Sequence, residues 1–93
     1  MTLLTEDEIA RALDTVPTWT RDGAEISRSV EAESFLAGLD LVTAVGRAAE
    51  DADHHPDIDI RWRTITFVLS THSEGGLTER DFALARTIDG IVG

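Results

Sequence analysis

The strongest constraint on the fold is an alternation of apolar and polar residues in the second half of the chain. From residue 57 to 62, isoleucine and tryptophan alternate with aspartate and arginine; from 64 to 70, isoleucine, phenylalanine and leucine alternate with threonine, valine and serine. A period of two residues is typical of strands that bury one face. Because the connection is short, the two runs are expected to pair as an antiparallel hairpin that turns near Arg63 and Thr64.

The first third of the chain predicts a helix followed by another hairpin. Thr5 and Glu8 fit a capping box, and the apolar spacing that follows predicts a helix from Glu6 to Asp14. Pro17 disfavours its continuation. Trp19 falls in a short extended piece, and Asp22-Gly23 provides residues that tolerate positive φ, so two short strands are expected on either side of that turn.

Two more helices are expected, one before and one after the alternating runs. The longer one is predicted from Glu31 to Asp53, ended by Pro56. Its predicted apolar stripe comprises Phe35, Leu39, Val42, Gly46 and Ala49. The last one starts at a second capping box, Thr78 with Asp81, and ends near Gly90. Asp81 is therefore expected to cap the start of this last helix.

The predicted order of elements is α-β-β-α-β-β-α in a single domain that spans residues 1–93. Paired strands with short connections indicate the α+β class, with a four-stranded antiparallel sheet and helices on one face. A domain of this size removes only a little over ~60% of its chain surface from water when it folds alone. Self-association is therefore expected, with Gly46 and the neighbouring alanines allowing the long helix to approach a second copy.

Charge and composition exclude several classes of function. The formal net charge is -10, which opposes binding to nucleic acid or to an anionic membrane surface. The chain has no cysteine, so disulfides and thiolate metal sites are excluded. No basic, apolar leader and no stretch of membrane-spanning length is present. We therefore expect a soluble, cytoplasmic protein.

The three histidines lie close together in the sequence, at His54, His55 and His72. The expected hairpin places the segment around His55 opposite the segment around His72, so the imidazoles can converge. From spacing alone, three interpretations stay open: favourable placement at a helix C-terminus, a metal site, or general acid-base catalysis. The adjacent pair lacks the i, i+4 spacing of helical metal motifs.

A longer motif contains these histidines. It reads Glu50-x-x-x-His54-His55-Pro56, followed by Trp62, His72 and Asp81. With these spacings the chain resembles the pterin-4a-carbinolamine dehydratases, also called dimerisation cofactors of a homeodomain transcription factor. The resemblance extends from about Thr5 to Asp89. It departs from the commoner pattern at Val30 and at Trp62-Arg63, which affects packing and the hairpin turn more than the histidines.

The resemblance implies an enzyme that acts without metal or organic cofactor. Its reaction is the dehydration of 4a-hydroxytetrahydrobiopterin-type pterins to quinonoid dihydropterin and water, which recycles the tetrahydropterin used by aromatic amino acid hydroxylases. The implied catalytic residues are His54, His55, His72 and Glu50. The implied substrate-binding residues are His54, His55, Pro56, Thr71, His72, Ser73, Glu74 and Trp19.

Within these sets the resemblance implies distinct roles. His54 and His72 form the acid-base pair, with the acid and the base not distinguished, and His55 holds the pterin and can share in proton transfer. Glu50, one helical turn before His54, is expected to orient it. The implied assembly is a homodimer or homotetramer, with a link to an aromatic amino acid hydroxylase. The alternative function is a non-catalytic dimerisation or assembly cofactor, and the complete histidine set favours the enzyme.

Overall fold

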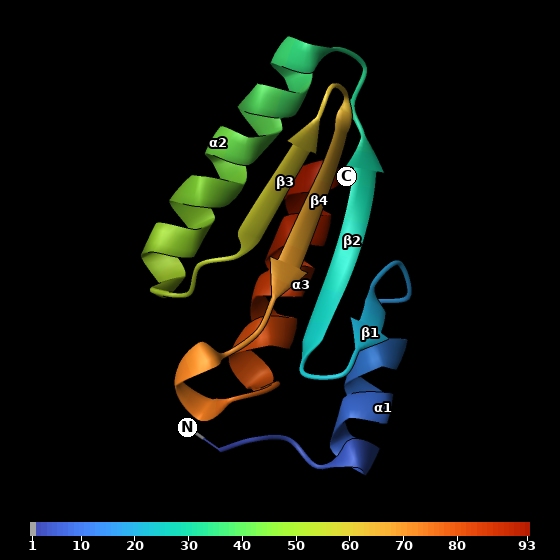
Figure 1. Cartoon of the computed structure of the whole chain (residues 1–93), viewed down its shortest axis with the longest axis vertical. Helices are drawn as coiled ribbons and strands as arrows, with labels where there is room; N and C mark the ends of the chain where they lie inside the picture. Colours follow the sequence, from blue (N-terminus) through green and yellow to red (C-terminus); the bar gives the residue numbers. More distant parts are fainter. Residues whose placement is uncertain (1) are drawn as a thin grey trace.

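The computed structural model describes residues 2–93 as a four-stranded antiparallel sheet covered by helices (Figure 1). The elements are α1 (Glu6–Asp14), β1 (Thr20–Asp22), β2 (Glu25–Glu31), α2 (Phe35–Ala52), β3 (Asp57–Arg61), β4 (Thr64–Leu69), the 3-10 helix η1 (His72–Glu74) and α3 (Glu79–Val92). The predicted order and the α+β class are confirmed. The short helix η1 was not predicted, and it carries one of the histidines.

The sheet order is β1-β2-β4-β3, which puts the alternating runs at its centre and at one edge. In the central strand β4, Ile65, Phe67 and Leu69 are fully buried, as their alternation predicts. Arg61 pairs with Thr64, so the hairpin turns at Trp62 and Arg63, one residue earlier than expected. Strand β3 has only one neighbour, and its Ile60 stays 41% exposed instead of half-buried as the alternation predicts.

The helices contribute to one core on one face of the sheet. In Figure 1, α2 and α3 lie across that face, and α1 lies beside β1. Fully buried Ile26, Val45, Phe67 and Phe82 belong to this core, which Ile9 of α1 joins. The predicted arrangement of helices over one face of an antiparallel sheet is therefore confirmed.

Helix α2 differs from its prediction at its start and in its buried stripe. Glu31 pairs with Thr64 as the last residue of β2, so the helix begins only at Phe35, after an N-cap at Ser34. Its buried residues are Gly38, Val45 and Ala49, with Leu41 and Val42 partly buried against the core. A Cβ on Gly38 would lie 3.1 Å from Ile65 Cδ1, so a glycine there allows the close approach of helix and sheet.

The other two helices begin where the sequence predicts. Both capping boxes form: Thr5 with Glu8 at α1, and Thr78 with Asp81 at α3. Helix α3 continues two residues past Gly90, to Val92. Among the helices of residues 2–93, none combines the length and the apolar composition that a membrane crossing requires.

In Figure 1 the start of α2 and the turn of the β3–β4 hairpin lie at the same end of the molecule, and both segments carry exposed apolar residues. Phe35 is 46% exposed, Leu36 70% and Trp62 73%. The two segments are joined by a hydrogen bond of 2.8 Å from Ala32 N to Arg63 O. The contact predicted around Gly46 lies further along α2, where a Cβ on the glycine would meet nothing within 4 Å, and it stays a prediction.

Candidate functional site

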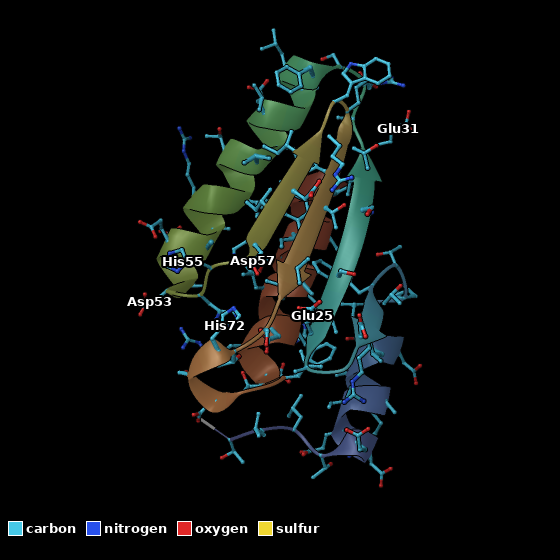
Figure 2. The ribbon with its side chains drawn as sticks, viewed as in Figure 1. Glu25, Glu31, Asp53, His55, Asp57 and His72 are labelled. Atoms are coloured by element: carbon cyan, nitrogen blue, oxygen red, sulfur yellow. The ribbon has the colours of Figure 1, made fainter. Side chains whose placement is uncertain are left out.

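The fold brings the three histidines to one end of the sheet. His54 and His55 follow α2, and His72 is the first residue of η1, just after β4. Figure 2 shows His55 and His72 at this end, with Asp53 and Asp57 nearby. An open depression of about 230 Å³ lies between these segments. It is lined by Asp53, His54, His55, Ser70, Thr71, His72, Ser73 and Arg80.

The chain reaches this depression through a tight helix ending. Asp53 has a left-handed backbone, with φ of 49°, a conformation that usually requires glycine. Its N–H donates to Glu50 O at 3.2 Å, and His54 N donates to Ala49 O at 3.1 Å, which forms a Schellman motif. The helix therefore stops at Ala52, and the two histidines leave it in a new direction.

His54 turns inward and is held by a buried carboxylate. Its ring is only 8% exposed, and its Nε2 lies 2.6 Å from Asp81 Oδ1. Asp81 is fully buried, and its Oδ2 accepts hydrogen bonds from Thr71 Oγ1 at 2.8 Å and from Thr78 N at 2.9 Å. Because a carboxylate only accepts, the Nε2 of His54 carries the proton, and Nδ1 is the atom left for other chemistry.

Glu50 pairs with His55 and not with His54. The contact joins Glu50 Oε2 to His55 Nε2, between two exposed side chains. The expected i, i+4 relation to His54 fails because the left-handed residue Asp53 ends the helical spacing before the histidine is reached. Glu50 thus contacts the histidine predicted to hold the pterin, and Asp81 takes the position predicted for Glu50.

His72 is the most open member of the group. Its side chain is exposed, and it makes no hydrogen bond with any described residue of the chain. The loop that carries it is anchored on both sides of the histidine: Thr71 N donates to Gly76 O at 2.9 Å, and Gly75 N donates to His72 O at 3.1 Å. The depression therefore places an oriented, buried imidazole beside a free one.

Comparison with known proteins identifies the family. Residues 2–91 match the family described as pterin 4 alpha carbinolamine dehydratase. The chain belongs to that family. Relatives that carry the family's name are 66% identical over 94% of this chain in Nocardia farcinica, covering 92% of the relative, and 58% identical over the whole chain in Mycobacteroides abscessus, covering 99% of the relative.

Solved structures show the same fold. A transcriptional coactivator/pterin dehydratase from Brucella melitensis has a TM-score of 0.94 at 32% identity, over 99% of this chain and 100% of that protein. A pterin dehydratase-like protein described as a RuBisCO assembly factor in the alpha-carboxysome has a TM-score of 0.67 at 17% identity, over 81% of this chain and 87% of that one.

The structure brings together part of the residue set predicted for this dehydratase family. His54, His55, Thr71, His72 and Ser73 line the depression. Pro56 and Glu74 are not lining residues but lie beside those that are. Trp19 is not a lining residue: it is 5% exposed in the core, and its Nε1 donates to Asp89 Oδ1 at 2.8 Å. Its predicted role as a wall of the pterin pocket is not supported within this chain.

Sequence reasoning missed the pocket residues Asp53, Ser70 and Arg80, and the contact of Asp81 with His54. Arg80 is half-buried, and its Nη2 donates to Ala52 O at 3.0 Å and to Asp53 O at 2.5 Å. One signal could have singled it out, because a cation in the first turn of a helix opposes the helix dipole. Asp81 is part of the motif, but the sequence assigned it only to the helix cap, so its second contact, with His54, was not predicted.

The structure gives the metal interpretation no support. Within residues 2–93, no group of three or more histidine, cysteine, aspartate or glutamate side chains is arranged to hold a metal ion. Each of two histidines is paired with its own carboxylate, His54 with Asp81 and His55 with Glu50, and the two pairs do not converge into one ligand set.

The buried carboxylate leads to a first prediction. Asp81→Ala removes the acceptor of three hydrogen bonds in a region without solvent, so the free energy of unfolding should fall by about 3 kcal/mol or more. Urea denaturation followed by circular dichroism measures this change. Glu79→Ala is the matched control in the same helical turn, where the exposed pair with Arg86 should contribute less than about 1 kcal/mol. Equal losses in the two variants would contradict a structural role for the Asp81 network.

Proposed function

We propose that the protein catalyses the dehydration of 4a-hydroxytetrahydropterins to quinonoid dihydropterin and water by general acid-base catalysis. The observation that carries this proposal is the contrast between two histidines of one depression. His54 is 8% exposed and bound to buried Asp81, whereas His72 is exposed and without a side-chain partner among the described residues. Two imidazoles in such different environments are suited to opposite proton-transfer roles.

The reaction asks for two proton transfers on neighbouring atoms. The C4a–O bond breaks as the hydroxyl takes up a proton and leaves as water. The N5–H bond breaks as its proton goes to a base, and its electron pair forms the N5=C4a double bond. No electron is gained or lost overall, and the two groups return to their starting states by exchanging one proton.

His54 is the base in this proposal. Asp81 holds the proton on Nε2, so Nδ1 presents its lone pair to the N5 proton of the substrate. When Nδ1 takes that proton, the imidazolium gains a charge-assisted hydrogen bond to a carboxylate that is shielded from water. This stabilisation grows as the reaction proceeds, which is the requirement for lowering the barrier.

His72 is the acid, and the remaining side chains hold the ring. The imidazole of His72 is exposed, so it can exchange protons with solvent between turnovers. His55, paired with Glu50, also lines the depression, and its exposed ring can stack on or donate to a flat pterin. Thr71 and Ser73, the neighbours of His72 in the chain, also line the depression.

The family relationship supports this substrate class. The relatives from Nocardia farcinica and Mycobacteroides abscessus carry the dehydratase name at 66% and 58% identity. The physiological role we propose is the recycling, in the cytoplasm, of the tetrahydropterin used by an aromatic amino acid hydroxylase, which leaves the 4a-hydroxytetrahydropterin as its product. The net charge of -10 is compatible with a substrate that carries no phosphate.

The proposal is tested by turnover of purified protein. We expect it to accelerate dehydration of 4a-hydroxytetrahydropterin after exhaustive chelation, because both proton-transfer groups belong to the chain. The absorbance change on formation of quinonoid dihydropterin follows the reaction. A rate no faster than the uncatalysed dehydration, or one restored only by added zinc or iron, would reject this mechanism.

The roles of the histidines predict different kinetic effects. His54→Gln and His72→Gln should each lower kcat by roughly 10²–10⁴-fold, the usual contribution of a general acid or base. His55→Gln should mainly raise KM, because a group that binds substrate and transition state alike affects KM more than kcat. Steady-state kinetics with circular dichroism as a folding control distinguishes these outcomes. Full turnover in all three variants would favour the non-catalytic alternative.

The exposed apolar end of the molecule supports self-association as part of the proposal. Phe35, Leu36, Ile60 and Trp62 expose large apolar side chains, which monomeric proteins of this size rarely group together. A second copy of the chain covers this surface in a homodimer or homotetramer. The same surface also suits the alternative function as a dimerisation or assembly cofactor, because it is separate from the histidine depression.

Self-association predicts a change in mass on disruption of this surface. Leu36→Glu should shift the oligomer toward monomer, because a charge would have to be buried in the contact. Light scattering at micromolar concentration measures the mass. Leu3→Glu is the control: Leu3 is 47% exposed and lies against Gly76, away from this surface. A monomeric wild-type protein, or the same mass in both variants as in wild type, would contradict the proposed contact.

A further inference from the structure

Arg80 occupies an electrostatically unfavourable position for which its own helix gives no reason. It is the second residue of α3, in a first turn that otherwise contains Glu79 and Asp81. The N-terminus of a helix carries partial positive charge, so a cation there is destabilising, while the acidic neighbours follow the usual preference. A local rule that is broken in this way points to a requirement outside the helix.

That requirement lies at the end of α2. The Arg80 Nη2 donates to the carbonyls of Ala52 and Asp53, at 3.0 and 2.5 Å, which are among the carbonyls that a helix end leaves without partners. Helix α2 has no basic residue of its own in its last turn. Arg80 therefore caps the C-terminus of α2 from the N-terminus of α3.

The capped turn is the one that directs the histidines. Asp53 has φ of 49°, a left-handed conformation that costs a residue other than glycine some stability and persists only where neighbours hold it. Its carbonyl is bound by Arg80, and the next residue in the chain is His54. Any relaxation of Asp53 would rotate the His54 ring away from Asp81.

Arg80 is also part of the wall between two cavities. The polar histidine depression and an apolar cavity of about 210 Å³ between α2 and α3 have two lining residues in common, His54 and Arg80. The apolar cavity is otherwise lined by Ala48, Ala52, Ala83, Leu84 and Thr87. Apart from Leu84 and Arg80, the side chains on that side are small, so the orientation of the imidazole depends on its contact with Asp81 and on the turn that Arg80 holds.

We propose that Arg80 is a positioning residue that sets the orientation of His54 by holding the left-handed turn at Asp53. This inference rests on the proposed dehydratase function for its kinetic consequence, but not for its structural one. Arg80 acts through the turn, so losing it should affect the proton transfer made by His54 more than the binding of the pterin ring.

The first experiment compares Arg80→Gln with Arg86→Gln. Both remove one arginine from α3, and Arg86 donates hydrogen bonds to Glu79 and Thr15, neither of which lines the histidine depression. Arg80→Gln should lower kcat by roughly 10- to 100-fold with a small change in KM, because a displaced catalytic group costs rate. Arg86→Gln should match the wild type. Equal kcat in the two variants would overturn the proposal.

A second readout does not need activity. In proton NMR with ¹⁵N-labelled histidine, the Nε2 proton of His54 should exchange with water slowly in the wild type, because Asp81 binds it in a buried site. Arg80→Gln should accelerate this exchange and broaden the signal, and Arg86→Gln should not. If the wild type proves inactive, the proposed function fails, but this measurement still decides the role of Arg80. An unchanged signal in Arg80→Gln would overturn it.

A double-mutant cycle tests the route through Asp53. Glycine adopts the left-handed turn without strain, so the loss of kcat caused by Arg80→Gln should be smaller in an Asp53→Gly background. Equal losses in the two backgrounds would contradict the route through the turn.

Arg80→Lys retains a cation that can donate to these carbonyls, and it should keep more of the kcat and of the slow exchange. If Arg80→Gln does not fold, the exchange rate of the His54 Nε2 proton is measured in Arg80→Lys instead. A rate equal to that of the wild type supports the proposal, and a rate equal to that of free histidine rejects it.

Discussion

The arrangement of the whole site depends on one carboxylate that no water reaches. Asp81 binds His54 through Oδ1, and Thr71 and the backbone of Thr78 through Oδ2. A buried carboxylate is costly unless hydrogen-bond donors compensate it, so the three donors to Asp81 cannot move away independently. The start of α3, the end of β4 and the segment after α2 are thereby fixed relative to one another.

This constraint separates the three histidines by environment. His54 is enclosed and bound, His55 is paired with a carboxylate in solvent, and His72 is open. A single side-chain type therefore supplies groups with different freedom to move and to exchange protons. Figure 2 shows Asp53 and Asp57 near His55 and His72, and Arg80 is the cation that lines the same depression.

Much of the fold could be predicted from local pattern. The capping boxes of Thr5 and Thr78 involve residues three apart, and the alternation through Phe67 reports burial on one face directly, so both were correct. The start of α2 was wrong because the extension of β2 to Glu31 depends on pairing with a strand far along the chain. Helical periodicity cannot detect that competition.

The site was predictable in its residue types and only partly in its contacts. The longer motif that contains His54, His55 and His72 identified the family, and the expected hairpin predicted that the histidines could converge. The partners of the histidines could not be predicted, because they depend on the left-handed backbone at Asp53. An aspartate adopts that conformation much less often than a glycine, so the sequence does not indicate the turn. Arg80 reaches the site by a contact between two helices, which is a property of packing and not of sequence spacing.

The position of all three histidines around a single hairpin has a consequence for the order of folding. A hairpin with a two-residue turn closes on a timescale of roughly 1–10 μs, because its ends are close in sequence. Strand β2 must instead join β4 across the intervening helix, which pairs Ile26 with Leu69 and closes a much longer loop. The hairpin by itself can therefore bring the segments of the imidazoles together, whereas the contact that orients His54 also requires α3, which carries Asp81. A chain in which the hairpin has formed but α3 has not docked would hold the histidines near one another without the hydrogen bond that orients His54.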